Sequence, residues 1–182
     1  MRILIVTQYF WPENFRITDL ASALKEKGHD VVVLTGMPNY PSGKLYEGYS
    51  WWKKRHENIN DIPVFRVPLF VRRQSKSWQL AVNYLSFVIS ACLLAPWFLR
   101  KQHFDIVVLD PPALIKRKKD FKSGYEAYRR LNHLALQVLG KDGILVSASC
   151  SYHLSKNNLH EILRSSARHI DRNLSIVIKG GQ

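Results

Sequence analysis

The sequence predicts an α/β fold on a doubly wound, mostly parallel, Rossmann-like sheet of about six strands. Short apolar runs alternate along the chain with longer segments in which apolar residues recur every three or four positions. Such alternation is typical of parallel sheets with helices on both faces. The 182 residues are 46% apolar and 12% aromatic. This content is enough for a buried core and excludes a disordered basic tail.

Each element rests on a local pattern. Residues 2–7 are the first apolar run, and residues 17–27 place Ile17, Leu20 and Leu24 on one helical face before Gly28. Residues 37–61 are rich in glycine, proline and asparagine, so we expect a long loop there. Strands are expected at residues 2–7, 30–34, 63–68, 106–109, 143–148 and 174–178. Helices are expected at residues 17–27, 76–100, 120–139 and 156–170.

The composition limits the classes of partner and site. The chain has 27 Lys and Arg against 14 Asp and Glu, a formal charge of +13, and the excess is spread over both halves. Dispersed positive charge suits RNA, an anionic membrane surface or a phosphorylated ligand, with plain solubility as the alternative. Two cysteines, Cys92 and Cys150, exclude a disulfide scaffold and fit a reducing, cytoplasmic location. No histidine or cysteine spacing matches a metal site, so none is expected.

Residues 78–99 carry no charge and reach the length of a membrane span. Basic residues flank them, namely Arg72, Arg73, Lys76, Arg100 and Lys101. Pro96 and several polar side chains favour a helix that is buried or lies at a membrane interface over one that spans the bilayer. No cleavable signal peptide is expected, because the first apolar run ends at Gln8. Peripheral attachment at the inner membrane face is therefore the alternative to a purely cytoplasmic location.

Ligands of doubly wound sheets bind beyond the carboxyl ends of the strands. That rule draws attention to residues 7–9, 35–36, 110–112 and 149–151. The loop after the first strand, TQYFWPENF, contains no glycine, and the second strand ends without an acidic residue. The first half therefore lacks the usual signature of a dinucleotide or S-adenosylmethionine site.

The first part of the chain resembles the N-terminal domain of GT-B-fold, family-4-like glycosyltransferases. The resemblance covers MRILIVTQYFWPENFRITDLASALKEKGHDVVVLTGMPNYPSGKLYEGY and the later segment IPVFRV, within residues 1 to about 104. It implies a domain that faces the sugar acceptor, often a lipid-linked sugar, at a membrane. A sugar nucleotide is not expected as a ligand, because the C-terminal domain that binds it in this family has no counterpart here.

From about Phe104 the chain resembles a different family. The segment FDIVVLDPPALIKRKKDFKSGYEAYRRLNHLALQVLGKDGILVSASCSYHLS is similar to the catalytic half of class I S-adenosylmethionine-dependent 23S ribosomal RNA 5-cytosine methyltransferases. Asp110-Pro111-Pro112 matches the family's fourth motif and the sequence SCS at residues 149–151 its sixth. The resemblance implies RNA as substrate and S-adenosylmethionine as cofactor, although the glycine-rich cofactor loop is absent.

Two residues would carry the chemistry of such an enzyme. Carbon 5 of cytosine is a poor nucleophile, so a cysteine thiolate first adds at carbon 6, and Cys150 stands at a strand end where it could do so. A cationic setting would favour this role by lowering the thiol pKa. Asp110 would hold the cytosine edge, with Pro111 and Pro112 shaping the wall. The alternatives are a buried cysteine that packs as a small hydrophobe and a carboxylate that caps a turn.

Further binding residues are expected around these two. In the second part they are Lys116, Arg117 and Lys118, which suit phosphates, and Tyr152, which could stack a base. In the first part they are Glu13, Asn14 and Arg16, where an acceptor or a phosphate could lie. A solvated charged face and ordinary turn chemistry are the respective alternatives.

Taken together, the residues predict a hybrid with a glycosyltransferase-like part at residues 1–104 and a methyltransferase-like part at residues 105–182, both in one continuous sheet. The preferred function is an RNA 5-cytosine methyltransferase module that is catalytically incomplete. The alternatives are a membrane-associated acceptor-binding domain of polysaccharide synthesis and a folded chimera without activity. The sequence indicates no oligomeric state.

Overall fold

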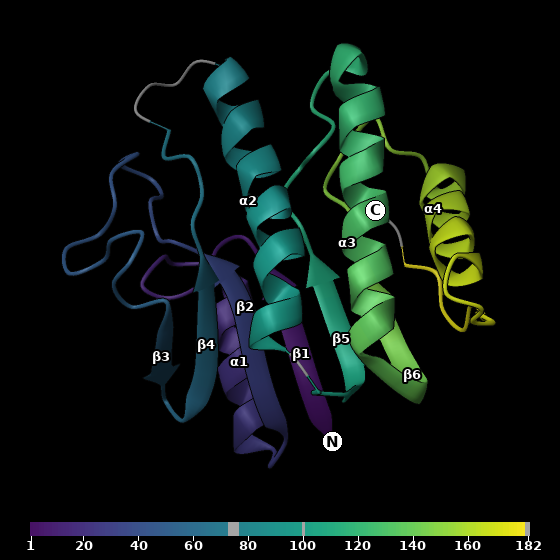
Figure 1. Ribbon diagram of the computed structural model, residues 1–182, viewed down its shortest axis with the longest axis horizontal. Helices are drawn as coiled ribbons and strands as arrows, with labels where there is room; N and C mark the ends of the chain where they lie inside the picture. The colour runs from purple at the N-terminus through teal and green to yellow at the C-terminus, as the bar shows by residue number, and fades with distance from the viewer. Residues whose placement is uncertain (73–76, 100, 181–182) are drawn as a thin grey trace.

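The computed structural model describes residues 1–72, 77–99 and 101–180 and contains one six-stranded sheet of order β3-β4-β2-β1-β5-β6 (Figure 1). All neighbours pair in parallel except β3, which pairs antiparallel with β4. The strands are β1 (Arg2–Thr7), β2 (Asp30–Gly36), β3 (His56–Ile59), β4 (Ile62–Val67), β5 (Phe104–Asp110) and β6 (Leu139–Ser147). The predicted α/β fold with a mostly parallel sheet is confirmed.

Helices cover both faces of the sheet, as expected for strands that are apolar on both sides. In β1, Leu4 and Val6 belong to one buried cluster, whereas Ile3 and Ile5 belong to the other. Helix α1 (Arg16–Glu26) covers the second face, and α2 (Ser77–Phe98) and α3 (Phe121–Val138) cover the first. In Figure 1, α2 and α3 lie in front of the sheet, α1 lies behind it, and α4 (Lys156–Arg168) stands beside α3. A short 3₁₀ turn, η1 (Lys118–Asp120), precedes α3.

One strand prediction was wrong, and one strand was missed. No strand forms at residues 174–178, where Ile176, Val177 and Ile178 are 48–86% exposed, because β-forming side chains make a strand only where a partner strand is in reach. The sixth strand is β3 instead, inside the segment predicted as a loop. The sequence feature that indicates this strand is the pair Asn60-Asp61. Both residues have a positive φ (50° and 61°) and make the tight turn between β3 and β4.

On the face of the sheet that α1 covers, the side chains become more exposed toward β6. On β5, Ile106 and Val108 are only partly buried. On β6, which ends the sheet, Ile144 is 58% exposed and Val146 is 47% exposed. This face of β6, the last strand of the sheet, is therefore apolar and in contact with solvent.

Helix α2 is long and apolar enough to cross a membrane by length and composition. One such helix is weak support for a span, because the core helix of a water-soluble protein meets the same criteria. In α2, one side is buried against the sheet through Phe87, Val88, Ala91 and Ala95. The outer stripe is open to solvent and includes Leu93, which is 72% exposed. Of the basic residues predicted to flank the helix, Arg73, Lys76 and Arg100 lie outside the described residues, as do both ends of the helix predicted at 76–100.

Candidate functional site

The two methyltransferase-like motifs meet at the carboxyl edge of the sheet. Strands β5 and β6 are parallel neighbours with Leu109 opposite Ser147, and the Ala148 N–H donates to the Leu109 carbonyl at 2.9 Å. The loop that begins at Asp110 and the loop at residues 149–151 therefore leave the sheet side by side. We call them the Asp110 loop (residues 110–115) and the Cys150 loop (residues 148–151).

Tyr128 of α3 links the two loops. Its ring is fully buried, and its hydroxyl accepts a hydrogen bond from Ser149 Oγ at 2.9 Å and shares another with Ser151 Oγ at 2.9 Å. The same hydroxyl lies 3.4 Å from the Pro112 carbonyl oxygen, and Ser151 Oγ accepts from the Ile115 N–H at 3.0 Å. A single phenol thus ties the residues on both sides of Cys150 to the Asp110 loop.

Cys150 is exposed, and its thiol interacts electrostatically with Asp110. Desolvation raises the pKa of the Cys150 thiol, and the negative charge of Asp110 raises it further. Desolvation also raises the pKa of the Asp110 carboxyl. Both causes act against the lowered pKa that a cationic setting would produce, so the thiol is mostly protonated at neutral pH and needs a base to become a nucleophile.

One face of α3 that contributes to the site was not predicted from the sequence. It is formed by Gly124, Tyr128 and Asn132 at intervals of four residues. A Cβ on Gly124 would lie 2.4 Å from Ile115 Cγ1 and 2.8 Å from the Leu114 carbonyl oxygen, so this glycine lets the Asp110 loop approach the helix. Asn132 is fully buried and accepts from Ser147 Oγ at 2.8 Å. The available signal was polar side chains on the apolar face of a helix.

The other residues predicted around this site differ in placement. Pro111 and Pro112 are buried in the wall of the Asp110 loop. Lys116 and Lys118 are exposed, and Arg117 is paired with Asp120 at 2.7 Å, within the same turn. Tyr152 is 94% exposed, so its ring is open to a partner. The basic run is thus a solvent-exposed face next to the site, with one of its cations already paired.

The residues predicted in the first part do not join this site. Asn14 and Arg16 are exposed. Glu13 is only 1% exposed, and its Oε1 accepts from the Asn39 and Tyr40 N–H groups at 2.8 and 2.7 Å. Burial raises its pKa. Glu13 therefore connects the loop after β1 to the loop after β2 and is turned away from solvent.

The carboxyl ends of β1 and β2 are filled by the protein's own side chains. Gln8 and Phe10 are each 1% exposed, and Gln8 Nε2 donates to Asn83 of α2 at 2.6 Å. A Cβ on Gly36 would meet Leu69 at 2.5 Å and the Gln8 carbonyl oxygen at 3.0 Å, so the protein itself occupies the space beside this glycine. S-adenosylmethionine does not fit the described residues at this place, which agrees with the glycine-free loop.

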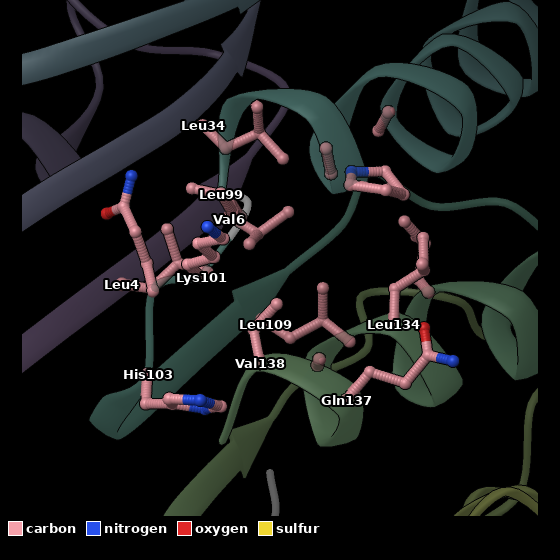
Figure 2. A pocket seen from close by; sticks show the side chains of 16 residues that line it. Leu4, Val6, Leu34, Leu99, Lys101, His103, Leu109, Leu134, Gln137 and Val138 are labelled. Carbon is pink, nitrogen blue, oxygen red and sulfur yellow. The ribbon is translucent and has the colours of Figure 1, made fainter. Parts of the chain in front are cut away.

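A cavity of about 200 Å³ lies elsewhere, between α2, α3 and strands β1, β2 and β5. Figure 2 shows apolar side chains such as Leu4, Leu109 and Val138 around it, with Lys101 and His103 among the polar ones. None of the predicted site residues lines this cavity. It marks the place where α2 packs against α3.

No protein-family model matches the chain. Among curated proteins, the ribosomal RNA large subunit methyltransferase of Deinococcus radiodurans is 41% identical over 69 residues, which are 38% of this chain and 17% of that protein. Ribosomal RNA large subunit methyltransferase I of Escherichia coli O1:K1 / APEC is 30% identical over 78 residues, 43% of this chain and 20% of that protein. A protein of Methanocaldococcus jannaschii named in the same class is 35% identical over 82 residues, 45% of this chain and 21% of that protein.

The chain thus spans about a fifth of the length of the curated relatives it matches. These similarities support the methyltransferase interpretation and not the glycosyltransferase one, so the resemblance of residues 1 to about 104 stays a prediction. Over roughly two fifths of its length, the chain is similar to ribosomal RNA large subunit methyltransferases.

Proposed function

We propose that residues 105–182 form the part of an RNA 5-cytosine methyltransferase that binds the target base and supplies its nucleophile. One observation carries the proposal: the exposed thiol Cys150 and the carboxyl group of Asp110 belong to loops that leave the ends of two adjacent parallel strands and are joined through Tyr128. The similarity to ribosomal RNA methyltransferases supports RNA as the partner and the cytoplasm as the location. The basic face with Lys116 and Lys118 would then contact phosphates.

The two side chains have complementary roles in this proposal. The Cys150 thiolate adds to carbon 6 of the cytosine. Asp110 would accept the proton of the thiol, deliver it to the ring nitrogen N3 as electron density moves onto the ring, and take it back from N3 when the thiolate leaves. The buried prolines Pro111 and Pro112 would keep water from one side of the base.

This chemistry can be observed without a methyl donor. After the thiolate bonds to carbon 6, carbon 5 takes a proton from solvent. Loss of the original carbon-5 proton and cleavage of the sulfur–carbon bond then return the cytosine and the thiolate. The net result is exchange of the carbon-5 hydrogen with water. We expect this exchange and no complete methyl transfer, because the ends of β1 and β2 are closed to S-adenosylmethionine.

The deciding experiment measures tritium release from a large-subunit ribosomal RNA transcript that carries [5-³H]cytidine. We expect release with the parent chain and none above background with Cys150→Ala, while Cys92→Ala, a matched cysteine control, retains release. Equal release from parent and Cys150→Ala, or none from the parent, would refute the proposal. Calorimetry with S-adenosylmethionine is the companion measurement, and we expect no binding up to about 1 mM ligand.

A second candidate is peripheral attachment to an anionic membrane, as in the acceptor-binding interpretation. It is favoured by the outer stripe of α2, in which Trp78, Ile89, Leu93 and Trp97 are 51–78% exposed with a tryptophan toward each end. In a sedimentation assay with phosphatidylglycerol vesicles, Leu93→Glu is expected to abolish binding. Ile144→Glu, at another exposed apolar position, on β6, should not. Absence of binding by the parent at low salt would dismiss this candidate.

A further inference from the structure

We propose that Tyr128 is a positioning residue that fixes the distance between Cys150 and Asp110 through its hydroxyl group. This inference deepens the proposed function and rests on it for its role in catalysis. The placement of the thiol itself can be tested without RNA.

The argument begins with the hydrogen bonds on either side of the thiol. Ser149 and Ser151 flank Cys150, and both side chains reach the Tyr128 hydroxyl at 2.9 Å. The Ser151 N–H also donates to Ser149 Oγ at 3.1 Å, which closes the loop into a tight turn. The position of Cys150 is therefore set by two neighbours that share one hydrogen-bonding partner.

The same hydroxyl restrains the Asp110 loop. It reaches the Pro112 carbonyl oxygen at 3.4 Å, and Ser151 Oγ accepts from the Ile115 N–H. One turn earlier on α3, Gly124 lies directly against Leu114 and Ile115. The loops that carry Asp110 and Cys150 are thus both held against the same helix, α3.

Burial makes Tyr128 suited to this task. Its ring is fully buried in the core between α3 and the sheet, so the hydroxyl has little freedom to move. Desolvation raises its pKa, which keeps the phenol neutral and able to donate as well as accept at physiological pH. The ionisable groups that interact with the Cys150 thiol in the described part of the chain are Asp110 on β5 and Tyr128 on α3.

The test is a double-mutant cycle on the thiol. The pH profile of Cys150 alkylation by iodoacetamide is followed by mass spectrometry of its peptide in the parent, Asp110→Asn, Tyr128→Phe and the double variant. Asp110→Asn removes a negative charge, so it should lower the apparent thiol pKa and speed alkylation at pH 7.5 by about threefold. In the Tyr128→Phe background the same change should have less than about half that effect on the logarithm of the rate.

Tyr125→Phe is the matched control, because it is the same substitution on the same helix at a hydroxyl that is not bonded to either loop. In that background the effect of Asp110→Asn should be unchanged. An undiminished Asp110→Asn effect in folded Tyr128→Phe protein would overturn the inference. If Tyr128→Phe does not fold, Ser149→Ala replaces it in the cycle, because it removes one of the two serine contacts from a partly exposed position.

The double-mutant cycle tests the positioning role of Tyr128, whereas the tritium assay tests the proposed function, so failure of one can be told from failure of the other. A thiol pKa that depends on Tyr128, together with no tritium release from the parent, would refute the proposed function and support the positioning role of Tyr128. Tritium release together with an undiminished effect in the cycle would support the function and overturn the inference.

Discussion

The carboxyl edge of the sheet differs between its two ends. Over β1, β2 and β4 the edge is closed: Gln8, Phe10, Glu13 and Arg66 are at most 1% exposed. Over β5 and β6 it is open, and Cys150 and Tyr152 face solvent. In doubly wound sheets, ligands bind beyond the carboxyl ends of the strands at a topological switch point, which lies here between β1 and β5. The difference shows that the filling of this edge by side chains, together with topology, decides where chemistry can occur.

The closed end has its own polar network. Arg66 bonds to Glu57 at 2.5 Å, to the Gly36 carbonyl oxygen at 3.2 Å and to the Trp11 carbonyl oxygen. Tyr9 and Phe15 stack on each other in the loop after β1, with their ring centroids 4.7 Å apart. Buried charges that are paired in this way hold the loops in one arrangement.

The largest expected effect comes from breaking the closed end. Glu13→Ala removes the acceptor of two buried N–H groups and should lower the free energy of unfolding by about 3 kcal/mol. Glu13→Gln keeps an acceptor oxygen and should be close to neutral at pH 7. Chemical denaturation of both variants measures the difference. A similar loss in both would mean that the charge matters more than the hydrogen bonds.

The pH dependence of Glu13 has a definite sign. Its pKa is raised in the folded state, so the folded protein binds more protons, and stability falls as pH rises from the ordinary value of 4.5 through the raised folded value. Glu13→Gln should remove this slope. Denaturation midpoints at several pH values check it, and an unchanged slope would contradict the assignment.

The alkylation rates of the two cysteines allow the open end of the sheet to be compared with the interior. Burial raises the pKa of the half-buried Cys92 to about 11, whereas Cys150 is exposed. At pH 8 iodoacetamide should therefore modify Cys150 at least about tenfold faster than Cys92. Peptide mass spectrometry over time measures both rates, with Cys150→Ser as the control that isolates Cys92. Equal rates would mean that the interior opens as readily as the site.

A smaller effect is expected where α2 meets α3. The cavity between α2 and α3 is bounded by small residues, among them Ala95 and Ala135. Filling it with Ala95→Leu should raise the free energy of unfolding by about 1 kcal/mol. Ala21→Leu, on α1, is the control: Ala21 is fully buried on the other face without lining this cavity, so the larger side chain should destabilise the protein. Thermal melting distinguishes the two directions.

The fold was largely predictable because its strands and helices have clear apolar periods. Residues 2–7 are β1 to the residue, and Gly28 ends α1 with a φ of 82°, as its sequence position predicts. The strand β3 was missed because HENI has no apolar run and pairs only through its turn and β4. The segment at 174–178 shows the opposite error, since it has strand-forming residues without a partner.

The site was predictable only in part. Motif position brought Asp110 and Cys150 together, because adjacent parallel strands end at one edge. Tyr128 could not be assigned from its own sequence position: its partners lie 16 to 23 residues away in two loops. The buried location of Glu13 was equally out of reach, since it depends on a loop more than twenty residues further on.

The two lateral edges of the sheet have different consequences for handling the protein. The β3 edge is short, whereas the β6 edge presents Ile144 and Val146 to water along a longer strand. An apolar open edge of this kind recruits strands from other molecules as the protein concentration rises. Because β6 leads directly into the Cys150 loop, such association would shield the reactive thiol. Alkylation and exchange rates should therefore be compared at several dilutions before any loss is attributed to a mutation.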